Sequence, residues 1–347
     1  MAYTTIDDPS VHFQTALYTG NATQRDITND GNSDLQPDWV WIKCRSAAEA
    51  NMLYDSTRGV TKDLRSDGTA AENTNAQGLQ TFNSNGFQLG TLQNTNFNTK
   101  TMVAWQWKAN GGTTTTNDAS ATGIGNTDSV YQANTDAGFS IVTFSGTGSG
   151  MTVAHGLGGT PTLIISKARN DTENWAVHTT LIDGSLDYLR LSETDAAGNS
   201  SFSLPTSTVF GYNGSNNYIA YCFRSIQGYS KIGTYIGNGD GNNTAADGTF
   251  VYTGFKPAWV MVKSSTVTQG WNIFDNKRTP TNEMGAFLFA DTADAETTGY
   301  DAMDFLSNGF KLRKNLNGAN DSGQTYVYMA FAENPFVSSK GVPTTAR

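Results

Sequence analysis

Few residues in this chain have the types and spacing that acid–base or nucleophilic chemistry requires. The 347 residues include only three histidines, His12, His155 and His178. A Ser-His-Asp triad needs its serine in a Gly-x-Ser-x-Gly turn between a strand and a helix, and the chain offers no such turn in that context. His178 occupies the position that Phe274 and Tyr54 hold in two similar segments. We therefore expect His178 to pack in a core and predict no catalytic residue.

Two glycine-rich segments have the composition of ion-binding loops. Residues 146–150, Gly-Thr-Gly-Ser-Gly, lack the lysine and the helix that follow a phosphate-binding loop, so we interpret them as a β-turn. Residues 237–243, Gly-Asn-Gly-Asp-Gly-Asn-Asn, carry side-chain oxygens of the kind that calcium prefers, with Asp240 as the candidate ligand. Because the EF-hand spacing is absent, a plain turn is the first interpretation, and we expect no cofactor.

Carbohydrate chemistry would need either paired carboxylates or exposed aromatic rings. Hydrolysis of a glycan uses two carboxylates about 5–10 Å apart across a groove. No spacing selects a pair among the acidic candidates, which are Asp183, Asp187, Glu193 and Asp195. Binding without hydrolysis relies on rings that stack on sugar faces. Tyr212 and Tyr300 lie in glycine- or threonine-rich loops and are the candidates for glycan or receptor binding.

The elements that must position these residues recur three times. Each repeat opens with a proline, a short apolar run and a lysine at the seventh position, at residues 37–43, 161–167 and 257–263. Each closes with an apolar-aromatic strand around an alanine. The repeat positions are Pro37, Pro161 and Pro257, then Lys43, Lys167 and Lys263, then Ala104, Ala220 and Ala330. Recurrence of this kind indicates three related structural units.

The repeated lysines end an apolar strand in every unit. A charge at such a place limits aggregation between sheets, and this is our first interpretation. The alternative is a salt bridge to Asp55 or Asp275, each of which lies in the next apolar segment.

The composition favours short strands joined by turns. Glycine contributes 36 residues, and threonine, asparagine and serine clusters recur throughout the chain. Residues 39–42 are apolar on both faces of a strand, which suits a strand buried between two layers. We predict an all-β chain of tandem β-sandwich units, jelly-roll-like, with three internal repeats.

The predicted boundaries follow the repeats. An N-terminal sandwich unit covers residues 1–112, and a Gly/Thr/Ser-rich linker covers residues 113–137. A second sandwich unit covers residues 138–229. A third covers residues 230–347 and includes a C-terminal tail.

Charge and hydropathy exclude several classes of partner. The formal charge of −9 disfavours nucleic acids and anionic membrane surfaces. No apolar stretch approaches the roughly 18–20 residues that cross a membrane, so we expect no membrane insertion. The N-terminus lacks the basic and apolar regions of a signal peptide. Cys44 and Cys222 lie in apolar segments and are expected to be buried free thiols.

Several of these segments together resemble a repeat in virion proteins of tailed bacteriophages, including marine cyanophages and pelagiphages. The segments are residues 257–263, 305–312 (Phe-Leu-Ser-Asn-Gly-Phe-Lys-Leu), 328–336 (Tyr-Met-Ala-Phe-Ala-Glu-Asn-Pro-Phe), 154–158 and 219–223. The resemblance covers the chain from about Leu17 to Phe336. Such proteins are described as tail-fibre-like or appendage proteins without assigned catalytic residues. The resemblance implies a place in a virion and brings no active site with it.

We therefore expect a non-enzymatic virion protein, made in the host cytoplasm, that serves as a tail fibre or surface appendage. It would assemble as a homo-oligomer, with a trimer favoured, and would contact other virion proteins through its N-terminal unit. The second and third units would contact a host surface glycan or receptor through many weak interactions. The alternatives are a capsid decoration or head-fibre protein and, less favoured, a depolymerase of host glycans.

Overall fold

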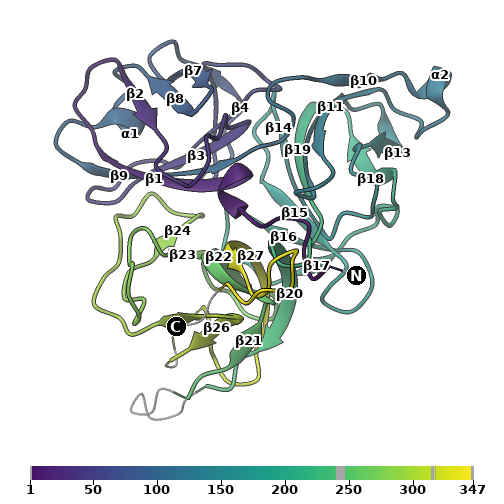
Figure 1. Cartoon of the computed structure of the whole chain (residues 1–347). Helices are drawn as coiled ribbons and strands as arrows, with labels where there is room; N and C mark the ends of the chain where they lie inside the picture. The colour runs from purple at the N-terminus through teal and green to yellow at the C-terminus, as the bar shows by residue number, and fades with distance from the viewer. Residues whose placement is uncertain (1, 240–246, 314–315, 317, 345–347) are drawn as a thin grey trace.

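The computed structural model describes residues 2–239, 247–313, 316 and 318–344, and in this part the fold is built from antiparallel strands. Three larger sheets each pair with a smaller one, and this confirms the predicted all-β sandwich architecture (Figure 1). The helices are single turns: η1 (Pro9–Val11), α1 (Gln93–Asn96) and α2 (Ala119–Thr122). None of the helices described is long and apolar enough to span a membrane.

The three larger sheets share one strand order. The first is β1 (Phe13–Thr19), β9 (Thr101–Trp107), β3 (Trp39–Cys44), β4 (Met52–Asp55), β5 (Lys62–Arg65) and β6 (Asn73–Thr74). The second contains, in the same order, β12 (Phe139–Ser145), β19 (Asn217–Phe223), β14 (Leu163–Ala168), β15 (Ala176–Thr179), β16 (Asp187–Arg190) and β17 (Gly198–Asn199). The third is β20 (Ser230–Ile236), β27 (Thr325–Pro335), β22 (Phe255–Ser264), β23 (Asn272–Asp275) and β24 (Leu288–Phe289).

A smaller sheet covers one face of each larger sheet. These sheets are β2 (Arg25–Thr28), β8 (Gly86–Leu89) and β7 (Leu79–Asn83); β13 (Gly148–Ala154) and β18 (Val209–Gly214); and β21 (Phe250–Tyr252), β26 (Gly309–Leu312) and β25 (Met303–Leu306). Each pair of sheets encloses an apolar core of its own. In β3, for example, Val40 and Ile42 face this inner core because alternate side chains point to opposite sides of a strand.

The opposite faces of the larger sheets meet in one shared core. Its aromatic residues come from all three units and include Trp39, Trp107, Phe139, Phe223, Trp259 and Phe331. The rings lie in direct contact across units: the centroids of Trp39 and Tyr221 are 4.4 Å apart, and those of Phe13 and Phe331 are 5.2 Å apart. The units therefore surround a common centre, as Figure 1 shows, and the central strands are buried on both faces.

The segment predicted to be a linker belongs to the second unit's sheet. Within residues 113–137 lie β10 (Thr115–Asn117) and β11 (Ser129–Asn134), and β11 pairs with β12 over its whole length. The linker prediction was based on a low content of large apolar residues. A strand added to a sheet edge is held by its backbone hydrogen bonds, which polar sequences form equally well.

The third closing strand differs in register from the alignment by alanines, whereas the first two agree with it. The residue before the repeat lysine faces a closing-strand residue in each unit, and the pairs are Ile42–Ala104, Ser166–Ala220 and Val262–Tyr328. Ala330 lies two residues further along and faces Val260. The equivalence predicted for Ala330 was therefore wrong, although a shift of two residues keeps it on the face of the inner core.

Both cysteines are buried free thiols, as expected. Cys44 lies in the inner core of the first unit and Cys222 in that of the second. Burial raises the pKa of both thiols.

Candidate binding pocket and inter-unit contacts

The three repeat lysines are buried and bind backbone carbonyls. Lys43 donates from Nζ to the oxygen of Thr292 at 2.7 Å, and Lys263 donates to that of Asp195 at 2.9 Å. Lys167 donates to the oxygen of Ala168 at 2.8 Å. Burial lowers the pKa of each lysine to about 8. The interpretation as a protective surface charge was wrong. A pattern of residue types does not reveal that another unit covers Lys43 and Lys263, or that a loop of the same unit covers Lys167.

The alternative salt bridges from these lysines were wrong as well. Asp55 pairs with Arg58 at 2.5 Å, and Asp275 pairs with Arg278 at 2.5 Å. All four side chains are fully buried. Each arginine also donates to a carbonyl of its own unit, so the charges are compensated by several hydrogen bonds, as buried ions require.

In each larger sheet, the residue just before β4, β15 or β23 ties neighbouring units together. Trp175 donates from Nε1 to the carbonyl of Arg65 at 2.7 Å, and Trp271 donates to that of Arg190 at 2.8 Å. In the first unit the corresponding residue is Asn51. Its Nδ2 donates to the carbonyl oxygen of Ala290 in the third unit at 3.1 Å. The second unit thus binds the first, the third binds the second, and the first binds the third.

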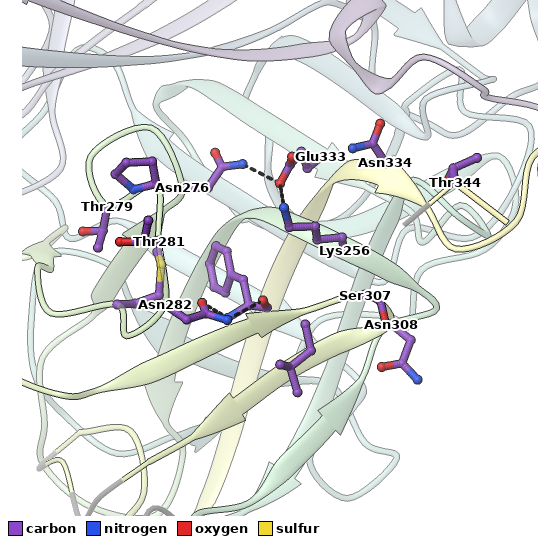
Figure 2. Close-up of a pocket in the computed structure, with 14 residues that line it drawn as sticks. Lys256, Asn276, Thr279, Thr281, Asn282, Ser307, Asn308, Glu333, Asn334 and Thr344 are labelled. Carbon is purple, nitrogen blue, oxygen red and sulfur yellow. Dashed lines mark hydrogen bonds and ion pairs between the residues drawn. The ribbon is translucent and has the colours of Figure 1, made fainter. Parts of the chain in front are cut away.

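A pocket of about 670 Å³ opens in the third unit, beside the turn that follows Asp275 (Figure 2). Its walls come from the start of β22, the loop after β23, the turn between β25 and β26, and the end of β27. The loop after β23 is anchored by Arg278, whose backbone N–H and guanidinium both donate to Asp275. Short turns and a buried ion pair therefore hold the walls in place.

Of the described residues that line this pocket, only two are charged, and they neutralise each other. Lys256 lies 2.7 Å from Glu333, and Asn276 donates to the same carboxylate at 2.9 Å. Asn282 both donates to and accepts from the backbone of Phe305, with 3.0 Å for each bond. This pairing joins the loop after β23 to β25.

Other polar side chains around the pocket make no hydrogen bond within the described chain. They are the hydroxyls of Thr279 and Thr281 and the amides of Asn308 and Asn334. Figure 2 shows Thr279 and Thr281 on one side and Asn308 on the other, with Lys256 and Glu333 between them. The pocket thus presents neutral donors and acceptors from several directions.

The family described as "Domain of unknown function (DUF7483)" matches residues 8–335. The chain belongs to this family. No curated protein and no solved structure matches it. The DUF7483 match runs through all three units, including β10 and β11 of the second unit's sheet. The family therefore corresponds to the whole three-unit body.

The DUF7483 fold separates the two tyrosines predicted to bind a glycan. Tyr212 is only 6% exposed and packs against Phe144 and His178 in the inner core, so its prediction as a rim residue was wrong. It lies in β18, where strand alternation turns it inward. Tyr300 is 50% exposed and rests edge-on against Phe287, outside the lining of the pocket.

The remaining candidate residues are the histidine predicted to pack in a core, the acidic residues considered for glycan hydrolysis and the candidate calcium ligand. His178 is buried in contact with Phe202, as its predicted packing role requires. Glu193 and Asp195 both pair with Arg190, at 2.9 and 3.1 Å. Asp240, the candidate calcium ligand, lies outside the described residues. Within the part that is described, no group of three or more His, Cys, Asp or Glu residues is arranged to hold a metal ion.

Sequence reasoning did not find the pocket in the third unit. One signal was present, the tight turn of Asn308 and Gly309, where a Cβ on the glycine would meet the carbonyl oxygen of Val251. The remaining walls come from segments spread between Lys256 and Thr344, and their meeting depends on the tertiary fold.

Proposed function

We propose that this chain is a structural protein of a tailed-bacteriophage virion, a tail fibre or similar surface appendage that takes part in attachment to the host. The observation that carries the proposal is the common core of the three sandwich units. In each unit, the face of the larger sheet that points away from the unit's own core is buried against the other two units. Side-chain hydrogen bonds from Asn51, Trp175 and Trp271 cross the three junctions between units. A body of this kind suits a particle component that must keep its shape outside the cell.

In this proposal attachment works through many weak contacts. Each copy offers a neutral, hydrogen-bonding pocket in its third unit. Copies held together on one particle would bind a surface far more strongly than a single copy, since later contacts form at high effective concentration. Because the aromatic faces are already buried within one chain, copies in a homo-oligomer would meet each other, and other virion proteins, through their outer surfaces.

Purified virions provide the test. Quantitative mass spectrometry would measure the copy number of the chain per particle, and antibody labelling in electron microscopy would locate it. A few tens of copies or fewer, with label on the tail, would support the proposal. Absence of the chain from the particles would refute it.

A second candidate is a capsid decoration or head-fibre protein. It is favoured by the recurrence of one strand order three times around a shared core, since such a body suits a site of threefold symmetry on a shell. Hundreds of copies per particle, with label on the capsid, would support this candidate and refute the tail assignment.

A further inference from the structure

We propose that the pocket of the third unit binds a neutral oligosaccharide, recognised through its hydroxyl and N-acetyl groups. This inference rests on the proposed attachment function and names the class of ligand for it.

The charge of the pocket disfavours ionic ligands. Among the described residues, Lys256 and Glu333 are the only charged ones in its lining, and they lie 2.7 Å apart. An anionic ligand would have to compete with Glu333 for the ammonium group, and a cationic ligand would have to compete with Lys256. A neutral ligand leaves this pair intact and avoids the cost of separating the two charges.

The unpaired groups match the hydrogen bonding of a sugar. A hydroxyl and a carboxamide each donate and accept, as do the hydroxyl and acetamido groups of saccharides. Within the described chain, the side chains of Thr279, Thr281, Asn308 and Asn334 have these capacities unused. A volume of about 670 Å³ lies within the range of small-molecule sites, about 300–1,000 Å³.

The first unit fills the equivalent place with a carboxamide of its own. Ser56 follows Asp55 as Asn276 follows Asp275. Gln132 of β11 donates from its amide to Ser56 at 2.9 Å and to Thr57 at 2.7 Å, and it accepts from the N–H of Gly112 at 2.9 Å. A neutral amide is therefore a good occupant of this position in the fold.

The pocket exists in the third unit because the corresponding strand is absent beside it. In the second unit β11 lies on the outer edge of β12 and reaches the loop after Asp55. The counterpart of β12 in the first unit is β1. The first unit reaches the loop after Asp275 through Asp30, which follows β2 and pairs with Lys277 at 2.8 Å. Within the described residues no strand pairs with the outer edge of β1, so the space beside that loop stays open.

The test is calorimetric titration of the full-length chain with three soluble trisaccharides: tri-N-acetylchitotriose, maltotriose and a sialylated trisaccharide. We expect binding of a neutral saccharide in preference to the sialylated one. The double variant Asn308→Ala/Asn334→Ala should weaken this binding by about tenfold or more, since two hydrogen bonds are lost. Neither amide is bonded within the described chain, so folding should be unaffected, and circular dichroism checks this. The matched control Tyr300→Ala removes an exposed ring outside the pocket and should bind as the wild type does.

Several results would overturn the inference: no heat of binding with either neutral trisaccharide, stronger binding of the sialylated one, unchanged binding by the double variant, or loss of binding with Tyr300→Ala. The particle measurements separate this failure from that of the proposed function. A chain present on virions that binds neither neutral trisaccharide refutes only the ligand class. A chain that binds through this pocket but is absent from virions refutes the proposed function.

Discussion

The indole Nε1 of Trp105 donates a hydrogen bond of 2.9 Å to Oδ2 of Asp275, which joins the first unit to the third. The same carboxylate binds Arg278, and Arg278 holds the loop that forms one wall of the pocket. Tyr221 makes the equivalent contact from the second unit to Asp55 of the first, at 2.7 Å. One buried carboxylate thus supports both a junction between units and, in the third unit, the geometry of the pocket.

Replacing this carboxylate should destabilise the protein strongly. Asp275→Asn preserves shape but removes one of the two carboxylates that pair with the buried guanidinium of Arg278, leaving only Glu296 within the described chain, and a buried pair broken in this way costs roughly 3–5 kcal/mol of unfolding free energy. Chemical denaturation measures the loss. The matched control is Lys277→Ala, which removes an exposed ion pair with Asp30 and should cost about 0–1 kcal/mol. Equal losses in the two variants would contradict the role assigned to the buried pair.

The junction contact of Trp105 can be separated from the packing of its ring. Trp105→Phe removes both ring volume and the hydrogen bond to Asp275. Trp41→Phe removes similar volume only, since the buried Nε1 of Trp41 has no partner in the described structure. We expect Trp105→Phe to cost roughly 1–3 kcal/mol more in unfolding free energy, because a charged acceptor loses a donor. Indistinguishable denaturation midpoints for the two variants would argue against the bond.

Lys263 should stabilise the folded protein through its hydrogen bonds to backbone carbonyl oxygens. Lys263→Met keeps the length of the side chain but leaves the carbonyl oxygens of Thr194, Asp195 and Ser264 without this donor. A loss of roughly 1–3 kcal/mol is expected for such buried acceptors. Lys231→Met, at a more exposed position, is the control, and thermal denaturation compares them. A stabilised Lys263→Met protein would show that burying the amine costs more than its hydrogen bonds return.

Acid should destabilise the second unit through His178. Burial lowers the pKa of His178 to about 4 in the folded chain, below the value of about 6.5 in an unfolded chain. Because the folded pKa is the lower one, this contribution to stability is complete above about pH 6.5 and is lost as the pH falls toward 4, by about 3 kcal/mol in all.

The variant His178→Phe carries the residue type found at the corresponding position of the third unit, Phe274. Denaturation at several pH values between 7 and 4 should show a smaller acid-induced loss for this variant than for the wild type. Tyr300→Phe, a change at an exposed residue, should leave the wild-type profile unaltered. Parallel profiles for the wild type and His178→Phe would refute the assignment.

Local patterns predicted the strands and which of their faces are buried. Trp39 and Val40 alternate in a strand that is apolar on both sides, and both residues are fully buried, on opposite faces of the sheet. The same patterns could not predict that β10 and β11 would join a sheet, because hydrogen bonding of the backbone does not depend on apolar side chains. The patterns also aligned Ala330 with Ala104 and Ala220, although Tyr328 is the equivalent residue. A shift of two residues keeps the same side chains on the same face of the strand, so the pattern of apolar residues does not detect it.

The sequence by itself determined the all-β character of the chain, because strand alternation and turn residues act over a few neighbouring positions. Only the tertiary structure decided what lies against the outer face of each strand. Lys43 binds a carbonyl 249 residues away, and Trp105 binds a carboxylate 170 residues away. Such contacts depend on how whole units pack, and the free energy of that packing is summed over many distant residues. The pocket beside Asp275 also depends on the packing of units. Strand β11 of the second unit reaches the loop after Asp55, and no described strand of the first unit takes that place beside the loop after Asp275.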